Sequence, residues 1–244
     1  MKHLTRTLIA AGMIALTACS AQADAPPKDL KANLAKKIGQ PVDSVRETPI
    51  KGLYEVVLNK RHIVYSDAKG EFVVVGDMVN VATKKSLTEA RMAELNKVDF
   101  AKLPLADAIK EVRGNGSRKL VVFSDPDCPF CKRLETQSLA GIENITIYTF
   151  LMPLAGLHPD AARKSELIWC SVVKNPQKAW SEFMHNGNLP TGGKTTCDNP
   201  IARSVKLGES LGINGTPALI FADGQIVSGA IPKDEIEKIL ATQK

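Results

Sequence analysis

The stretch Lys119-Leu-Val-Val-Phe-Ser-Asp-Pro-Asp-Cys-Pro-Phe-Cys-Lys-Arg-Leu-Glu135 decides the fold of this chain. Its apolar run, 120–123, is typical of a strand that is buried on both faces. The polar segment 124–127 predicts a turn, because aspartate and proline favour turns. A helical pattern follows the turn, so Cys128 and Cys131 are expected at the start of a helix.

Two cysteines separated by two residues at a helix start are the signature of a thioredoxin-like redox site. Unpaired backbone N–H groups and the positive end of the helix dipole stabilise a thiolate at Cys128, and Lys132 and Arg133 add positive charge. We therefore expect Cys128 to be the nucleophile and Cys131, one turn later, to be the buried resolving thiol. The alternatives are an inert structural disulfide and a four-cysteine zinc site.

Residues 1–23 are typical of a signal peptide. A positively charged start, a short apolar segment and the small-residue cleavage site Ala21-Gln-Ala23 follow one another. The apolar segment is too short to span a bilayer. The segment Leu16-Thr-Ala-Cys19 also has the pattern of a lipobox, so lipidation at Cys19 is the alternative to soluble export, which we favour. Either route predicts a location outside the cytoplasm, where disulfides persist.

Four cysteines remain beyond residue 23, and an even number in an exported chain predicts two disulfides. Three pairings are formally possible. The close spacing of Cys128 and Cys131 favours these two as a redox-active pair, which leaves Cys170 and Cys197 as a structural pair. A bond that closes so long a loop typically contributes about 2–4 kcal/mol of stability.

The charge and the histidines argue against other functional classes. The net charge is +6 without a long run of like charges, so we expect no nucleic-acid binding. His62, His158 and His185 share no metal-ligand spacing with another ligand, and we expect them on the surface. The sequence therefore predicts neither a metal nor a cofactor.

Three carboxylates surround the cysteine motif, and one of them could pass protons to or from Cys131. They are Asp125, Asp127 and Glu135. For the two aspartates we favour solvated turn or capping roles. Trp169 and Trp180 lie at helical core spacing and are expected to pack in the core.

Residues 24–82 predict a small α+β domain. The spacing of apolar residues predicts a helix over Leu30–Ile38 that ends at Gly39. Short strand-like runs follow at 42–48, 53–58, 62–65, 72–75 and 78–81. A domain with this few elements buries little surface by itself, and we therefore expect it to have a partner. Residues 83–104, with Ser86 as a helix cap, are interpreted as a linker helix; the alternative is a core helix of the first domain.

Residues 105–244 predict an α/β thioredoxin fold with a helical insertion at about 155–212. We expect a helix at 109–112, strands at 119–123, 145–151, 213–221 and 225–228, and helices at 159–173, 176–184, 201–211 and 233–240. Pro217 at the entry of a strand is unusual, because proline lacks a ladder donor. In this fold we expect Pro217 to be cis and Thr216 to position the substrate.

Together these features resemble the DsbC/DsbG family of periplasmic disulfide isomerases. The resemblance rests on Cys128-Pro-Phe-Cys131, Gly215-Thr-Pro217, the Cys170/Cys197 pair and a first domain ending in Gly76-Asp-Met78. It implies cystatin-like N-terminal domains that form a homodimer, and thioredoxin domains that face a shared cleft. Its implied partners are misfolded or wrongly disulfide-bonded secreted proteins and DsbD, an inner-membrane reductase. It also implies a periplasmic location.

The dipeptide Pro129-Phe130 departs from the family pattern, because DsbC proteins typically have Gly-Tyr and DsbG proteins Pro-Tyr at these positions. This dipeptide helps to set the redox poise of the site. We predict an exported thiol-disulfide isomerase. The alternatives are a DsbG-like reductase that protects single cysteines, a cleft-based chaperone and a monomeric oxidase.

Overall fold

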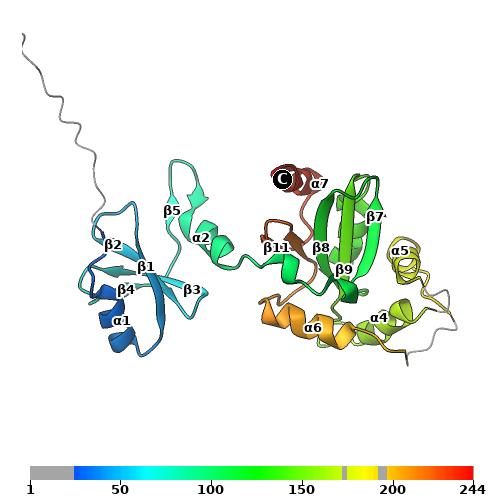
Figure 1. Cartoon of the computed structure of the whole chain (residues 1–244), viewed down its shortest axis with the longest axis horizontal. Coiled ribbons are helices and arrows are strands. Elements are labelled where there is room, and N and C mark those ends of the chain that lie inside the picture. The colour runs from blue at the N-terminus through cyan, green and yellow to red at the C-terminus, as the bar shows by residue number, and fades with distance from the viewer. Residues whose placement is uncertain (1–24, 172–174, 192–196, 244) are drawn as a thin grey trace, which may run out of the picture. The chain divides into compact units, whose positions relative to one another are not determined.

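The computed structural model describes residues 25–171, 175–191 and 197–243, which divide into two compact units at Gly76 (Figure 1). The signal peptide expected over 1–23, and Cys19 within it, lie outside the described residues. Within the ranges that are described, no helix is long and apolar enough to cross a membrane.

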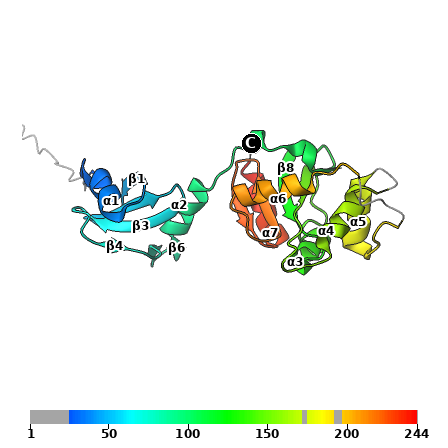
Figure 2. The same ribbon diagram turned by 90° about the horizontal axis from the view of Figure 1, so that it is seen from below.

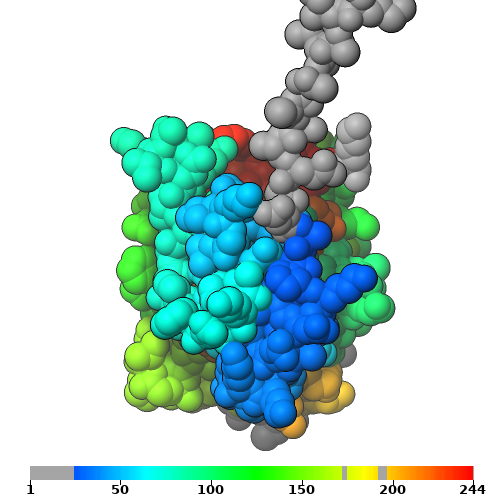
Figure 3. All heavy atoms as spheres, turned by 90° about the vertical axis from the view of Figure 1, so that its left-hand side faces the viewer, coloured from blue at the N-terminus to red at the C-terminus, as the bar shows by residue number. Residues whose placement is uncertain are grey.

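The first unit packs one helix against an antiparallel sheet. Helix α1 (Leu30–Ile38) ends at Gly39, whose positive φ is readily adopted by glycine. The sheet has the order β1-β2-β3-β4, with β1 at Val42–Glu47, β2 at Leu53–Leu58, β3 at His62–Asp67 and β4 at Val73–Val74. In Figure 3 the dark blue atoms of α1 lie against the lighter blue to cyan atoms of later segments of the same unit. Leu30 and Leu34 of α1 fill the core together with side chains from the first three strands.

Strand β4 forms one edge of this sheet, and the strand and the residues on either side of it carry apolar side chains that face solvent. Phe72, Val73, Val74 and Val75 are all exposed. An edge strand presents unpaired backbone groups, and a contiguous exposed apolar patch marks an interaction surface. The edge at β4 therefore has the properties of an interface.

The second unit begins with a short hairpin and a helix. Strands β5 (Val79–Asn80) and β6 (Lys85–Ser86) pair with each other, and helix α2 (Leu87–Leu95) follows. The Ser86 hydroxyl accepts a 2.8 Å hydrogen bond from the backbone N–H of Glu89, which caps this helix as the sequence predicted. The helical part of the expected linker 83–104 is α2, and a 3₁₀ turn at Phe100–Lys102 follows it.

The centre of the second unit is a five-stranded sheet of order β11-β10-β8-β9-β7. Its strands are β7 (Ile109–Arg113), β8 (Arg118–Ser124), β9 (Ile145–Leu151), β10 (Ala218–Phe221) and β11 (Ile226–Ser228). Strands β8 and β9 are parallel, and the other neighbours are antiparallel. The run 120–123 of β8 is completely buried, because strands flank it on both sides and helices cover both faces of the sheet.

Successive side chains of β8 point to opposite faces of the sheet and enter two different cores. Leu120 and Val122 pack with the side of the sheet that α7 (Lys233–Ala241) covers. Val121 and Phe123 pack on the side covered by α6 (Ile201–Ser210). Figures 1 and 2 show these helices around the sheet. The predicted strand at 119–123 is thus confirmed, and its two apolar faces explain its uninterrupted hydrophobic sequence.

The helical insertion contains α4 (Ala161–Trp169), α5 (Pro176–Asn186) and α6. Helix α4 is shorter than the predicted span 159–173. A disulfide joins Cys170, just after α4, to Cys197, shortly before α6, with 5.7 Å between their Cα atoms. The bond therefore links the two ends of the segment that contains α5.

One predicted element is wrong. The helix expected over 109–112 is the edge strand β7, which pairs antiparallel with β9. Four residues are too few to distinguish a helical period from an alternating one. The burial of Ile109 beside an exposed Lys110 is the alternation of a strand.

Candidate active site

The polypeptide around the two cysteines runs from β8 through a tight turn into a helix. The backbone N–H of Cys128 donates a 3.2 Å hydrogen bond to the carbonyl oxygen of Asp125, which closes the turn. Helix α3 (Pro129–Arg133) begins directly after Cys128. Pro129 suits this first position, since its missing N–H would have no partner there. A π-helical turn at Leu134–Ser138 continues α3.

Cys128 and Cys131 are both free thiols. The Cys128 side chain is 5% exposed, whereas Cys131 is completely buried. Cys128 Sγ donates a 3.4 Å hydrogen bond to the carbonyl oxygen of Thr216. Behind it, Cys131 Sγ accepts a 3.4 Å hydrogen bond from the backbone N–H of Asp125. Of the two sulfurs, that of Cys128 is therefore the one nearer to solvent.

Burial raises the pKa of the Cys131 thiol to about 12. The hydroxyl of Ser124, the amide of Asp125 and the hydroxyl of Thr216 act in the opposite direction, and the neighbouring Cys128 adds to the rise. Cys131 is therefore a thiol at neutral pH. It becomes a nucleophile only when a proton acceptor removes its proton.

The segment Thr216-Pro217, which precedes β10, contacts Cys128 although it is distant from it in the sequence. The peptide bond between these residues is cis. The Pro217 carbonyl accepts a 2.7 Å hydrogen bond from the backbone N–H of Gly229. The structure thus brings Cys128, Cys131 and Thr216 together, while the Cys170–Cys197 disulfide lies in the insertion.

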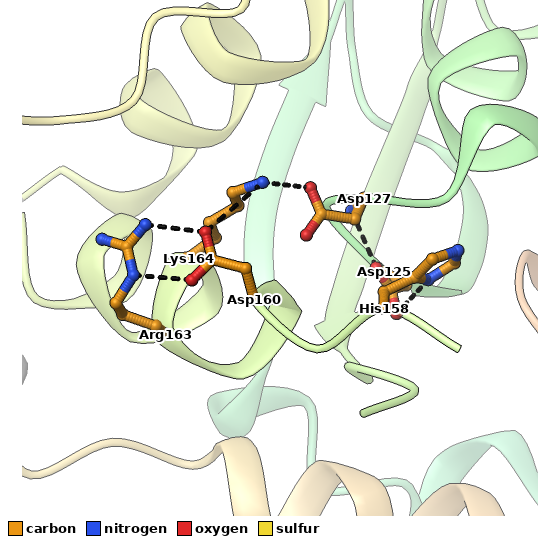
Figure 4. Close-up of polar contacts among 6 residues, drawn as sticks. All are labelled: Asp125, Asp127, His158, Asp160, Arg163 and Lys164. Carbon is orange, nitrogen blue, oxygen red and sulfur yellow. Dashed lines mark hydrogen bonds and ion pairs between the residues drawn. The ribbon is translucent and has the colours of Figure 1, made fainter. Parts of the chain in front are cut away.

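Asp125 is fully buried, so the expectation of a solvated carboxylate there is wrong. One carboxylate oxygen accepts a 2.7 Å hydrogen bond from the backbone N–H of Asp127. The other accepts a 2.6 Å hydrogen bond from the backbone N–H of Leu154. The same oxygen lies 3.0 Å from His158 Nδ1 (Figure 4). His158 is therefore half-buried against a carboxylate and is not the plain surface residue that we expected.

Ion pairs extend this cluster to the start of α4 (Figure 4). Lys164 Nζ lies 2.5 Å from an Asp127 carboxylate oxygen and 3.6 Å from one of Asp160. Arg163 makes two 2.7 Å hydrogen bonds to Asp160. The pKa of Lys164 is raised, chiefly by Asp127. Together these contacts fasten the turn before Cys128 to the insertion. Of this cluster, only the i, i+3 and i, i+4 spacing of Asp160, Arg163 and Lys164 was visible in the sequence.

Glu135 is buried one helical turn beyond Cys131. Its carboxylate accepts a 2.9 Å hydrogen bond from Trp180 Nε1, so Trp180 has a polar partner as well as the expected core position. Burial raises the pKa of Glu135 to about 7, opposed by the Trp180 hydrogen bond. Nearby Glu111 raises this pKa further and Arg113 lowers it. A carboxyl group that titrates near neutral pH is suited to proton transfer.

No metal centre is apparent among the residues that the structure describes: none of their histidine, cysteine, aspartate and glutamate side chains form a group of three or more that could hold an ion.

Comparison with known proteins assigns both units. Residues 105–244 match the family model of the thioredoxin-like domain, and residues 21–89 match that of the disulfide bond isomerase protein N-terminal domain. The probable thiol:disulfide interchange protein DsbC of Bordetella pertussis is 40% identical over 220 residues, which cover 89% of this chain and 76% of that protein. The chain belongs to the DsbC family. This confirms both the resemblance and the fold class predicted from the sequence.

Two further matches extend the comparison. The thiol:disulfide interchange protein DsbC of Escherichia coli is 28% identical over 234 residues, which cover 92% of each chain. The crystal structure of a disulfide interchange protein from Neisseria gonorrhoeae is 51% identical, with a TM-score of 0.53, and covers 57% of this chain and 96% of that one. The relatives thus span both units, whereas the solved structure matches a little over half of the chain.

Proposed function

We propose that this protein is an exported thiol-disulfide isomerase, which reduces and reshuffles incorrect disulfides in secreted proteins. The observation that carries the proposal is the pair of free thiols at the start of α3, with Cys128 against the backbone of Thr216 and Cys131 enclosed behind it. The relatives named as thiol:disulfide interchange proteins support the same activity.

The proposed reaction begins with Cys128. Its thiolate attacks one sulfur of a substrate disulfide, a mixed disulfide forms, and the other substrate sulfur leaves as a thiolate. A second substrate thiolate can then attack the mixed disulfide, which releases Cys128 and leaves a rearranged substrate. Alternatively Cys131 loses its proton and attacks Cys128, which releases reduced substrate and leaves a Cys128–Cys131 disulfide. We assign Thr216 and Pro217 the role of positioning the substrate chain.

The second route oxidises the enzyme, so it requires an external reductant. We propose that the inner-membrane reductase DsbD restores the two thiols and that the protein works in the periplasm, as other members of the DsbC family do. We assign residues 1–23 to a signal peptide and residues 24–82 to the dimerisation domain. Residues 83–104 form the linker, and residues 105–244 form the catalytic domain.

A homodimer formed through the first unit completes the proposal. The match to the disulfide bond isomerase N-terminal domain supports it. So does the exposed apolar edge at β4, which one copy of the chain leaves uncovered. Two active sites in one assembly favour reshuffling, because a substrate released by one site remains near the other.

Repair of a scrambled multi-disulfide enzyme tests the proposal. Recovery of that enzyme's activity is followed with the wild-type protein, with Cys128→Ser and with the double variant Cys128→Ser/Cys131→Ser. We expect repair to be abolished in both variants. Unimpaired repair by Cys128→Ser would contradict the proposal. The same samples are assayed for suppression of aggregation of a reduced, unfolded protein. If the double variant restores the activity of the scrambled enzyme as fully as the wild-type protein does, the protein acts as a cleft-based chaperone.

A reductase that protects single cysteines is the second candidate, because the site contains Pro129-Phe130 and Phe130 is exposed beside Cys128. An exposed ring can contact a client protein around a lone cysteine. A client with one oxidised cysteine and a client with scrambled disulfides separate the two functions. Faster turnover of the first client would favour the reductase.

A further inference from the structure

A hollow of about 390 Å³ lies beside the candidate active site. Phe130 and Arg133 of α3 form one part of its lining, and Thr216 and the segment Ser228–Ile231 form the rest. Thr216 is also the residue whose carbonyl oxygen accepts the Cys128 hydrogen bond. A polypeptide joined to Cys128 through a disulfide would therefore have its neighbouring side chains within reach of this hollow.

The charge of the hollow has one sign. Arg133 is the charged side chain among its lining residues, and it is exposed. Its guanidinium carbon lies 5.2 Å from the centre of the Phe130 ring, a cation–π contact that holds it against the wall. Within the described parts of the chain, no carboxylate is paired with Arg133.

The other arginines of the second unit differ in this respect. Each of them binds a carboxylate of this chain: Arg91, Arg113, Arg118, Arg163 and Arg203. A guanidinium presents planar N–H donors that fit a carboxylate. The contact with the Phe130 ring uses none of the N–H donors of Arg133 in an ion pair, so these donors remain available to a ligand.

Resting on the proposed function, we propose that this hollow is a specificity subsite, which selects an acidic side chain next to the cysteine of the disulfide that Cys128 attacks. The carboxylate of that side chain binds Arg133, and its methylene groups contact Phe130. The subsite makes sites with flanking aspartate or glutamate react faster than sites with flanking lysine. Because the hollow is open to solvent, the effect is that of an exposed ion pair and weakens as salt is added.

Short disulfide-bonded peptides test the assignment. Peptides are prepared with Glu, Gln, Lys or Phe adjacent to the cysteine, in one series before it and in another after it. The rate constant for loss of the peptide disulfide is measured with excess reduced protein. In at least one series the wild-type protein is expected to react with the Glu peptide about 2- to 5-fold faster than with the Gln peptide, the range for an exposed ion pair. The Lys peptide should be the slowest.

Two charge reversals one residue apart locate the effect. We expect Arg133→Glu to reverse the order of the Glu and Lys peptides. Lys132→Glu is the matched control, because Lys132 is exposed and carries the same charge but does not line the hollow. It should keep the wild-type order. Ratios of rate constants within one variant cancel any change in the reactivity of Cys128 itself.

The outcomes separate the two proposals. Equal rates for the Glu, Gln and Lys peptides in both series would overturn the subsite, as would an unchanged preference in Arg133→Glu. An equal loss of preference in Lys132→Glu would assign the effect to the general field of the helix and would also overturn it. A Phe peptide faster than the Glu peptide would assign the hollow to aromatic side chains instead. Failure of every peptide to react would contradict the proposed function itself.

Discussion

The thiol of Cys128 donates a 3.4 Å hydrogen bond to the carbonyl oxygen of Thr216, although the two residues are 88 positions apart in the chain. The register of the sheet explains their contact. Strands β8 and β10 are antiparallel neighbours in which Phe123 lies opposite Ala218. The end of β8 that leads to Cys128 therefore lies beside the start of β10, which Thr216 precedes.

We expect Glu135→Gln to change how stability depends on pH. The pKa of this carboxyl is about 7 in the folded protein and 4.5 ordinarily, so the folded state holds the proton more tightly. The contribution of this tighter proton binding to the free energy of unfolding is complete below pH about 4.5. It is lost as the pH rises to about 7, and the loss is on the order of 3 kcal/mol. Denaturant unfolding at pH 5 and pH 8 measures it.

In that comparison the glutamine variant should lose less stability than the wild-type protein between the two pH values. Glu143→Gln, at an exposed glutamate, is the control and should follow the wild-type protein. The same pH dependence in all three proteins would contradict the buried titration of Glu135.

We predict that Asp125→Asn destabilises the fold by about 1–3 kcal/mol, because the variant leaves a buried donor or acceptor unpaired. The native carboxylate accepts hydrogen bonds from the backbone of Asp127 and Leu154, and an amide group cannot accept with its nitrogen. Urea unfolding measures the loss. Asp160→Asn removes an exposed carboxylate at the outer end of the same cluster and should cost much less. Equal losses would mean that the buried end has no special role.

Removing the Cys170–Cys197 disulfide should lower stability without removing the exchange chemistry. The bond joins residues that are 27 positions apart, and loops of this length correspond to about 2–4 kcal/mol. The double variant Cys170→Ser/Cys197→Ser is compared with the wild-type protein in urea unfolding and in the peptide assay at 25 °C. Loss of thiol exchange in a variant that is still folded would assign these cysteines a redox role.

We expect Val74→Glu to convert the dimer to a monomer. The change places a charge in β4, on the exposed apolar edge of the first unit, where the Val74 side chain is 56% exposed. Val112→Glu is a matched control in β7, an edge strand of the five-stranded sheet, at a valine that is 55% exposed. Light scattering should give half the wild-type mass for the first variant and the wild-type mass for the second. A wild-type monomer would contradict the proposed assembly.

The parts of the fold that depend on local sequence were predicted well. The bounds of α1, β2 and β9 agree with the expected ranges, because each has a clear apolar period and a turn signal at its end. The strand β7 was mistaken for a helix, because its period is short and its identity depends on pairing with β9. Local pattern cannot reveal a partner that is distant in the sequence.

The same limit applies to the candidate site. Cys128 and Cys131 were found through their spacing and position before a helix, and Pro217 through its place at a strand entry. The contact of Asp125 with His158 joins residues 33 positions apart and depends on how the insertion folds back. The burial of Glu135 against Trp180 likewise depends on the packing of α5, which no spacing in the sequence specifies.

Capture of a substrate on Cys128 tests the proposed mechanism most directly. The Cys131→Ser variant is reduced, freed of reductant, mixed with a protein that contains several disulfides and quenched with acid. A non-reduced digest is then analysed by mass spectrometry. We predict a mixed disulfide between a substrate cysteine and Cys128, in an amount that the wild-type protein does not accumulate, because Cys131 resolves it there. Absence of this adduct, or attachment of substrate to Cys170 or Cys197 instead, would contradict the assignment of Cys128 as the nucleophile.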